Sequence, residues 1–297
     1  MTSSDFVTNM QSRMQMQMEI RDEDKLYRYN GVLYPRILCP EESFKALENI
    51  EAREDDVMLV AYPKCGFNWM VGVLRKIIAE ATGMKIESNM PPLIEFFGPD
   101  VVKVLDETPS PRLLGTHLLP DNIPKSFNAK KTKTLVIFRN PKDTLVSSYY
   151  FYDKMPVPSL PWDTFYSNFL SGDIVFGSYF DHALAWEKRM DDPNVMIVTY
   201  EELKQDLSEG VRQISTFFGF SLTEAQVQQI AEGSTFSAMK EKYANMVTGN
   251  NLFRKGEVGD WKNHFTPEQS QEMDDAFNKH LAGTRLGDKL NYQLYCQ

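Results

Sequence analysis

Apolar residues in this chain gather into short continuous runs, and each run is followed by a stretch with apolar residues at helical spacing. Three runs are typical of strands buried on both faces: residues 57–62, 134–140 and 195–201. Helical patterns follow them at residues 69–81, 141–152 and 208–218. Strands that alternate with helices predict an α/β fold, with a central, mainly parallel sheet flanked by helices on both faces.

Boundary signals predict further helices. Residues 41–50 follow Pro40 and carry apolar side chains on one face, and residues 223–232 open with capping-box spacing. Another helix is predicted to start at Thr266, with Pro267 at its first position.

No repeat, linker or break in composition divides residues 26–297, so we predict one domain there. Residues 1–25 are polar and rich in methionine, and we predict a mobile or loosely docked tail. This segment lacks the apolar centre of a signal peptide. No apolar run in the chain approaches the ~18 residues needed to span a bilayer, so we expect no membrane association.

Net charge and cysteine content limit which ligands and which cellular compartment suit this protein. The net charge of −9 argues against a nucleic-acid-binding surface, so any anionic ligand needs a local cluster of cations. Cys39, Cys65 and Cys296 are too few and too scattered for a disulfide framework or a zinc site. Reduced thiols in the cytosol fit this pattern best, so we predict a cytosolic protein.

The first candidate site follows the strand at residues 57–62. Lys64 and Gly66 lie in a short loop between this strand and a helix, where backbone N–H groups and a helix N-terminus attract anions. The order of lysine and glycine differs from a Walker A loop. Two alternatives stay open: Lys64 as a solvated loop lysine, and Cys65 either as a nucleophile or as a small residue in a tight turn.

The second candidate site begins at the end of the strand at residues 134–140. A magnesium-dependent nucleotidase would place an aspartate at such a strand end, but here it carries Arg139, which binds phosphate directly and needs no metal. Ser147 lies two helical turns further along the chain. The alternative is that Arg139 pairs with Asp143 at the surface, an interaction of little energetic value.

The third candidate site is a glycine-containing segment near the C-terminal end. Arg254 and Lys255 precede Gly256, and the three could clamp a phosphate through two cations and a backbone N–H. The alternative is a flexible surface loop. Trp261, a residue of buried type, indicates that the loop docks onto the body of the protein.

Taken together, these motifs resemble the cytosolic sulfotransferases. The chain contains YPKxGxxW after the first strand, RNPKDxxVSxYYF after the second and RKGxxGDWKNxFT near its end, in the order and spacing of that family. The resemblance extends from about Leu26 to the end of the chain. The CGxNW variant, the RKGEVGDWKN loop and the ending YxLYCQ are most similar to the 6B subfamily.

The resemblance implies transfer of a sulfuryl group from PAPS, 3′-phosphoadenosine 5′-phosphosulfate, to a hydroxyl or amine of a small acceptor, without a metal and with PAP as product. It implies that Lys64 and the backbone of residues 65–69 hold the 5′-phosphosulfate. By the same resemblance, the cofactor-binding residues would be Lys64, Cys65, Gly66, Phe67, Asn68, Trp69, Arg139, Ser147, Tyr200, Ser234, Phe236, Met239, Arg254, Lys255 and Gly256. Lys64 would also act in catalysis, by stabilising negative charge on the departing phosphate oxygen.

A catalytic base must come from four histidines. His182 and His280 fall in predicted helices and His264 in the third motif, whereas His117 follows an apolar strand-like segment. A lone histidine there is more often structural. The family's catalytic histidine lies in a THLP-type motif that Thr116-His117-Leu118 resembles, so we assign His117 as the base, with a pKa near the working pH.

The chain departs from the family at three places. Phe67 and Asn68 stand where many members have two threonines, and Gly115 stands where many have a lysine. The dimer motif KxxxTVxxxE begins at Lys262 and Thr266 but continues with Pro267 and Gln271. A homodimer by that route is therefore open.

Aromatic residues suggest an apolar acceptor pocket for an aromatic or steroid-like molecule: Phe96, Phe97, Tyr149, Phe151, Met155 and residues 246–253. The same spacings also suit a protein core. Two rival functions stay open. One is a catalytically silent PAPS- or PAP-binding module, suggested by Phe67 and Gly115. The other, a small-molecule kinase, is disfavoured because a Walker A loop and a magnesium carboxylate are missing.

Overall fold

The computed structural model describes residues 3–84, 93–243 and 254–297. Its main sheet has the strand order β4-β3-β5-β6, and all three neighbouring pairs are parallel. The strands are β3 (Val57–Ala61), β4 (Leu113–Thr116), β5 (Thr134–Phe138) and β6 (Val195–Thr199). This arrangement confirms the predicted fold class.

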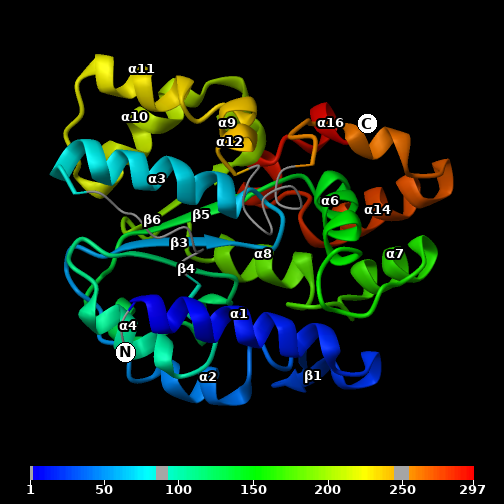
Figure 1. Cartoon of the computed structure of the whole chain (residues 1–297). Helices are drawn as coiled ribbons and strands as arrows, with labels where there is room; N and C mark the ends of the chain where they lie inside the picture. The colour runs from blue at the N-terminus through cyan, green and yellow to red at the C-terminus, as the bar shows by residue number, and fades with distance from the viewer. Residues whose placement is uncertain (1–2, 85–92, 244–253) are drawn as a thin grey trace.

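Helices cover both faces of the sheet (Figure 1). One side carries α3 (Phe67–Thr82), α10 (Leu207–Phe218) and α11 (Glu224–Glu232), and the other carries α1 (Ser3–Glu19), α2 (Glu41–Leu47) and α4 (Asp100–Glu107). Every residue of β3 and β5 is buried, which explains why both strands are continuously apolar.

The remaining elements surround this core. A separate antiparallel hairpin is formed by β1 (Leu26–Tyr29) and β2 (Val32–Pro35). The other helices are η1 (Asp22–Asp24), η2 (Pro120–Asn122), α5 (Lys125–Ala129), α6 (Pro141–Tyr152), α7 (Trp162–Ser171), α8 (Tyr179–Glu187), α9 (Tyr200–Gln205), α12 (Phe236–Tyr243), η3 (Asp260–Asn263), α14 (Pro267–His280), α15 (Arg285–Lys289) and α16 (Tyr292–Tyr295).

The predicted helix boundaries depend on caps that the structure contains. Thr223 and Thr266 each form a capping box with the glutamine three residues later, and Pro267 occupies the first turn of α14. All three predicted strands extended too far, since β3 ends at Ala61, β5 at Phe138 and β6 at Thr199. Residues 200–201, predicted as the end of a strand, begin α9 because Thr199 caps that helix in a further capping box.

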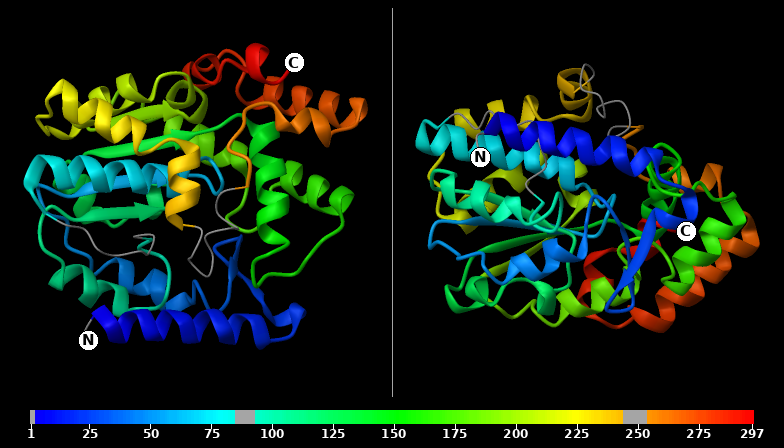
Figure 2. Two further views of the ribbon diagram at one scale, coloured as in Figure 1. Left: turned by 45° about the horizontal axis from the view of Figure 1, so that its top comes forward. Right: turned by 60° about the horizontal axis from the view of Figure 1, so that its bottom comes forward.

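The N-terminal segment contains a helix that we did not predict. Residues 3–19 form α1, which lies along the outside of the molecule in both views of Figure 2. Met10 and Met14 pack against the hydrophobic core, and Gln17 is fully buried. The division between a tail and a domain at residue 25 stays a prediction. Within the described ranges, no helix has the length and apolar character needed to cross a bilayer.

Candidate active site

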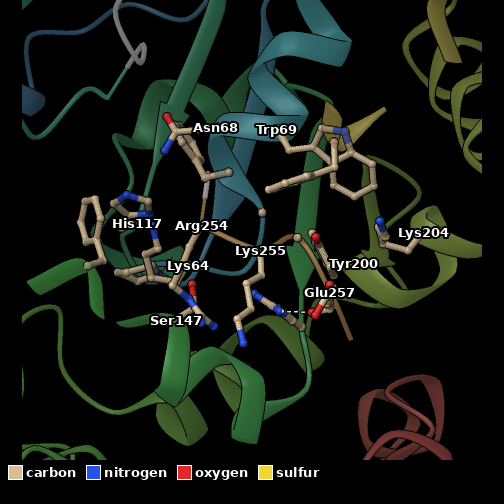
Figure 3. A pocket seen from close by; sticks show the side chains of 17 residues that line it. Lys64, Asn68, Trp69, His117, Ser147, Tyr200, Lys204, Arg254, Lys255 and Glu257 are labelled. Carbon is tan, nitrogen blue, oxygen red and sulfur yellow. Dashed lines mark hydrogen bonds between the residues drawn. The ribbon is translucent and has the colours of Figure 1, made fainter. Parts of the chain in front are cut away.

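A cavity lies where the chain leaves the strands of the main sheet, and it encloses about 870 Å³ of empty space, counting the part open to solvent. Parallel strands place their carboxyl ends at one edge, so the loops after β3, β4, β5 and β6 all reach it. The predicted site residues line it, except Cys65, Ser234 and Met239. In Figure 3, His117 and Lys64 lie on one side, and Trp69 and Tyr200 lie on the other.

The three exceptions lie beneath the cavity lining. Cys65 is fully buried with its Sγ 3.6 Å from Thr144 Oγ1, and burial raises the pKa of its thiol to about 12. Such a thiol is not a nucleophile at neutral pH, so Cys65 serves as a small residue in a tight turn. The carbonyl of Ser234 accepts a hydrogen bond from Trp69 Nε1 at 2.7 Å. Met239 packs on α3 at Gly72, where an added Cβ would clash with its terminal methyl carbon.

The loop between β3 and α3 has the shape of an anion cradle. Lys64 and Gly66 both have positive φ values, 70° and 109°. An added Cβ at Gly66 would lie 3.0 Å from atoms of both Ile137 and Tyr200, so this position requires glycine. Helix α3 begins at Phe67, and the amide groups of a first helical turn have no partners within the helix. The loop can therefore direct several N–H groups at one anion.

Lys64 adds a side-chain cation to this cradle. Its Nζ lies 3.7 Å from the centroid of the Phe151 ring. Burial, together with the positive charges of Arg139 and Arg254, lowers the pKa of Lys64 to about 7. Cations that raise one another's energy in this way form a site suited to an anion, because a bound anion would relieve the repulsion.

Arg139 follows β5 and is nearly buried, with 7% exposure. Its guanidinium lies 4.5 Å from the centroid of the Tyr200 ring, and Nη2 donates to the carbonyl of Glu257 at 2.8 Å. Its Nε is buried and has no hydrogen-bond partner within the described part of the chain. Arg139 does pair with Asp143, with Nη2 3.9 Å from Oδ2, but both side chains are buried, so the pair does not lie at the surface.

Asp143 instead anchors the third motif. Its carboxylate accepts hydrogen bonds from the backbone N–H of Gly259 at 2.7 Å and of Trp261 at 3.1 Å. A charged acceptor strengthens both bonds, and the side chain of Asp143 is 1% exposed. The segment around Gly259 is therefore docked onto α6, as Trp261 indicated.

The two cations of the third motif are paired with a buried carboxylate. Asp260 accepts from Arg254 at 2.5 Å and from Lys255 at 2.6 Å, and its side chain is 2% exposed. Burial opposes ionisation of Asp260, but the hydrogen bonds from Lys255 and Arg254 outweigh it and hold its pKa well below the usual range. Asp260 thus keeps both cations beside the cavity.

The last residues of the chain support the same segment. Trp261 Nε1 donates to the carbonyl of Tyr295 at 2.9 Å, and Lys262 Nζ donates to the carbonyl of Gln297 at 2.8 Å. Lys142 of α6 donates to the carbonyl of Cys296 at 2.8 Å. Backbone groups at residues 295–297 therefore connect α6 with the loop that carries the cations.

His117 follows β4, and its ring faces the cavity beside Lys64 (Figure 3). Its Nδ1 lies 2.8 Å from the carbonyl oxygen of Ala61. Since a carbonyl only accepts, Nδ1 must carry the proton, which leaves the lone pair of Nε2 available. Burial, and to a lesser extent the charge of Lys64, lowers the pKa of His117 to about 4.

The predicted pKa near the working pH was therefore wrong for this structure. Aromatic rings replace water around the imidazole: the ring centroids of Phe67 and Phe176 lie 5.0 and 5.1 Å from that of His117, and that of Phe96 lies 6.5 Å away. Phe67 stands where many family members have a threonine, so this substitution contributes directly to the desolvation of His117.

The other three histidines do not line the cavity. The ring of His182 lies 5.7 Å from those of Tyr62 and Phe138 in the core. His264 lies 3.3 Å from Asp260, and His280 stacks on Phe180.

Sequence reasoning missed some of the cavity lining. Pro63, Lys204 and Glu257 also line the cavity. Lys204 lies four residues after Tyr200 on α9, so the helical repeat from that tyrosine could have identified it. Glu257 contributes its carbonyl to Arg139, a contact with no sequence signal.

The predicted acceptor residues have different positions. Phe151 lines the cavity, and Phe96 lies near His117. Tyr149 instead packs edge-to-face on Trp162 and Phe165, and Met155 packs against the core. Residues 246–253 lie outside the described residues.

A sulfotransferase domain model matches residues 54–285 of the chain. The chain belongs to this family. As a sulfotransferase, it is an enzyme that transfers a sulfuryl group. Groups of three or more His, Cys, Asp or Glu side chains that could hold a metal ion do not occur in residues 3–84, 93–243 and 254–297.

Curated sulfotransferases share most of the chain. The chain is 57% identical to sulfotransferase 6B1 of Danio rerio, with 98% of this chain and 100% of the relative covered. It is 43% identical to sulfotransferase 6B1 of Homo sapiens, with 99% of this chain and 98% of the relative covered. These relatives agree with the predicted similarity to the 6B subfamily.

Solved sulfotransferase structures share the fold. The crystal structure of mouse sulfotransferase SULT7A1 complexed with PAP has a TM-score of 0.81 and 33% identity, and the match covers 92% of this chain and 99% of the other. Retinol dehydratase in complex with androsterone and PAP has a TM-score of 0.72 over 96% of each chain, but at 19% identity it supports the fold alone.

Proposed function

We propose that this sulfotransferase uses PAPS as its donor substrate and binds the nucleotide in the cavity at the carboxyl ends of the strands. The observation that carries the proposal is the gathering of Lys64, Arg139, Arg254 and Lys255 around one cavity in a protein of net charge −9. It is supported by a family member, 33% identical, whose crystal structure contains PAP.

The residues present fit a nucleotide with two anionic ends. The lowered pKa of Lys64 and the unpartnered Nε of Arg139 in the described part of the chain both indicate cationic groups with spare capacity for an anion. We assign the 5′-phosphosulfate to Lys64 and the amides of residues 66–69, since the N–H of Cys65, also expected there from the sequence, donates to the carbonyl of Tyr62 at 3.1 Å. We assign the 3′-phosphate to Arg139, Ser147 and the Arg254–Gly256 segment. The adenine is assigned to the cavity wall of Trp69, Tyr200 and Phe236.

PAPS supplies a sulfuryl group and a phosphate that leaves with negative charge. Lys64 and the first amides of α3 are preorganised donors for that charge. One such donor typically stabilises the transition state by ~3–4 kcal/mol. His117 is neutral at physiological pH because its pKa lies near 4. Its Nε2 can therefore accept the proton that the acceptor hydroxyl or amine loses when the new S–O or S–N bond forms.

We assign the acceptor to a small, apolar class with an aromatic or steroid-like skeleton. Phe96 and Phe176 pack edge-to-face on the imidazole of His117 without lining the cavity, and the side of the cavity with His117 is lined by Phe67 and Phe151. A flat apolar molecule would bury surface against these rings and direct one polar group at His117. We also propose a cytosolic location, and a homodimer through the segment from Lys262 to Gln271 stays open.

Transfer of radiolabelled sulfate from PAPS to a panel of phenols, steroids and amines tests the proposal. The wild type is expected to label at least one acceptor, and activity should survive EDTA. His117→Ala should lower turnover by about 10²-fold or more while PAP still binds. Lys64→Ala should lower both turnover and PAP affinity. PAP binding without transfer to any acceptor would instead support a silent nucleotide-binding module, and full turnover by Lys64→Ala would refute the mechanism.

A further inference from the structure

Helix α1 carries a buried glutamine that connects three separate backbone segments. Gln17 Nε2 donates to the carbonyl of Lys25 at 2.9 Å and to the carbonyl of Pro156 at 3.1 Å, and Oε1 accepts from the N–H of Ile37 at 2.7 Å. Gln17 is fully buried in a helix whose neighbouring side chains Met16 and Met18 are about half exposed. A side-chain amide with both donor hydrogens and its acceptor used is fixed in orientation.

A second side chain of α1 binds the same peptide segment. Arg13 Nη1 donates to the carbonyl of Ile37 at 3.1 Å, so α1 binds both the N–H and the C=O of this residue. The guanidinium of Arg13 also lies against Gly98, where an added Cβ would be 2.6 Å from Nη2. The segment around Ile37 is thereby held between α1 and the body of the protein.

Strand β2 and the residues after it support aromatic rings near His117. We call Phe96, Phe97 and Phe176 the aromatic wall. The N–H of Phe97 donates to the carbonyl of Leu38 at 2.6 Å, and the N–H of Phe176 donates to the carbonyl of Leu33 at 2.9 Å. Phe96 and Phe176 are stacked with centroids 5.9 Å apart.

A third connection reaches the other side of the cavity. Pro156, whose carbonyl accepts from Gln17, follows α6, which carries Phe151 in the cavity lining. Phe151 in the cavity lining and the aromatic wall near His117 are thus held by backbone segments that adjoin the residues bound by α1. Of the phosphate-binding cations, Arg139 and Arg254 contact side chains of α9 and η3, whereas Lys64 shares the Phe151 ring with the acceptor side.

We propose that α1, through Gln17, is a positioning element that sets the shape of the acceptor side of the cavity and thereby the range of acceptors. The inference rests on the proposed function, because it takes the space beside His117 to be the acceptor site. Gln17 touches no reacting group and acts through the backbone at Ile37 and Pro156. Its loss should therefore change acceptor recognition without changing nucleotide binding.

Gln17→Met tests this because methionine has a similar volume but cannot make the three hydrogen bonds. The matched control is Gln15→Met, on the exposed face of the same helix. We expect Gln17→Met to raise the acceptor KM by roughly five- to tenfold, as for the loss of about one net hydrogen bond, with the larger effect on steroid-sized acceptors than on single-ring phenols. The Kd for PAP should stay within about twofold, and Gln15→Met should change neither value.

Amide hydrogen exchange gives a readout that does not depend on activity. In Gln17→Met, the N–H groups of Phe97 and Phe176 should exchange faster than in the wild type, while those of the core strand β5 should exchange at the same rate. An acceptor KM equal to that of Gln15→Met, or a loss of PAP affinity by the same factor, would overturn the inference. If wild type transfers sulfate to no acceptor, the proposed function fails, and unchanged exchange at Phe97 and Phe176 would separately refute the positioning role.

Discussion

The affinity for PAP should depend on pH through Lys64. Its pKa of about 7 in the free protein means that half of the molecules carry a neutral amine at pH 7. PAP binds the charged form, and the bound phosphate restores the ordinary preference of a lysine for its proton. Affinity is therefore maximal when Lys64 is protonated, and it falls as the pH rises above 7.

The expected loss can be calculated. Between pH 7 and 9, the protonated fraction of Lys64 falls from about one half to about one hundredth, so the Kd for PAP should rise about fiftyfold. Each phosphate of PAP is already about nine-tenths ionised at pH 7, because the second pKa of a phosphate monoester lies near 6, so its own titration changes the Kd little over this range. Binding at pH 8 should take up about 0.9 proton per molecule.

Isothermal titration calorimetry in buffers of different ionisation enthalpy measures both quantities. Lys64→Met is the control, since it should bind PAP more weakly but show little change in Kd from pH 7 to 9 and little proton uptake. A wild-type Kd that stays constant over this range would refute the assignment of Lys64 as a desolvated cation of the phosphate site. So would proton uptake of equal size in Lys64→Met.

Two further variants test the scaffold of the site. Gly66→Ala should lower the free energy of unfolding by about 2 kcal/mol in urea titrations, because a positive φ and Cβ contacts at 3.0 Å with Ile137 and Tyr200 are both unfavourable. It should also weaken PAP binding. A variant as stable as the wild type would contradict this prediction. Asp143→Asn should lower the free energy of unfolding by about 2 kcal/mol and the PAP affinity at least tenfold, because two loop amides lose their charged acceptor. The control is Asp163→Asn, in the exposed first turn of α7. Equal effects of the two substitutions would contradict the role of Asp143.

The sequence was most informative at the ends of strands. Lys64 and Arg139 each follow a continuously apolar run, and parallel pairing brings such positions to one edge of the sheet whatever the details of packing. Local chemistry also predicted the helix starts at Thr223 and Thr266, because a capping box involves only four consecutive residues.

Features that depend on distant contacts could not be predicted in this way. Gln17 is buried because three backbone groups from other segments surround it, so a polar sequence gave no sign of a docked helix. Asp143 resembles a surface residue in its own motif, and only the fold brings Gly259 to it. The low pKa of His117 likewise arises from rings that are far from it in the chain.

The carbonyl groups at residues 295–297 have a practical consequence for work on this enzyme. Trp261, Lys142 and Lys262 bind them, so the order of the cationic loop depends on a strip of backbone more than thirty positions downstream. Removing residues 295–297 should weaken nucleotide binding while leaving the parallel sheet intact. An affinity tag fused directly after Gln297 would place a flexible chain at the same point, so purification handles are better separated from it by a cleavable spacer.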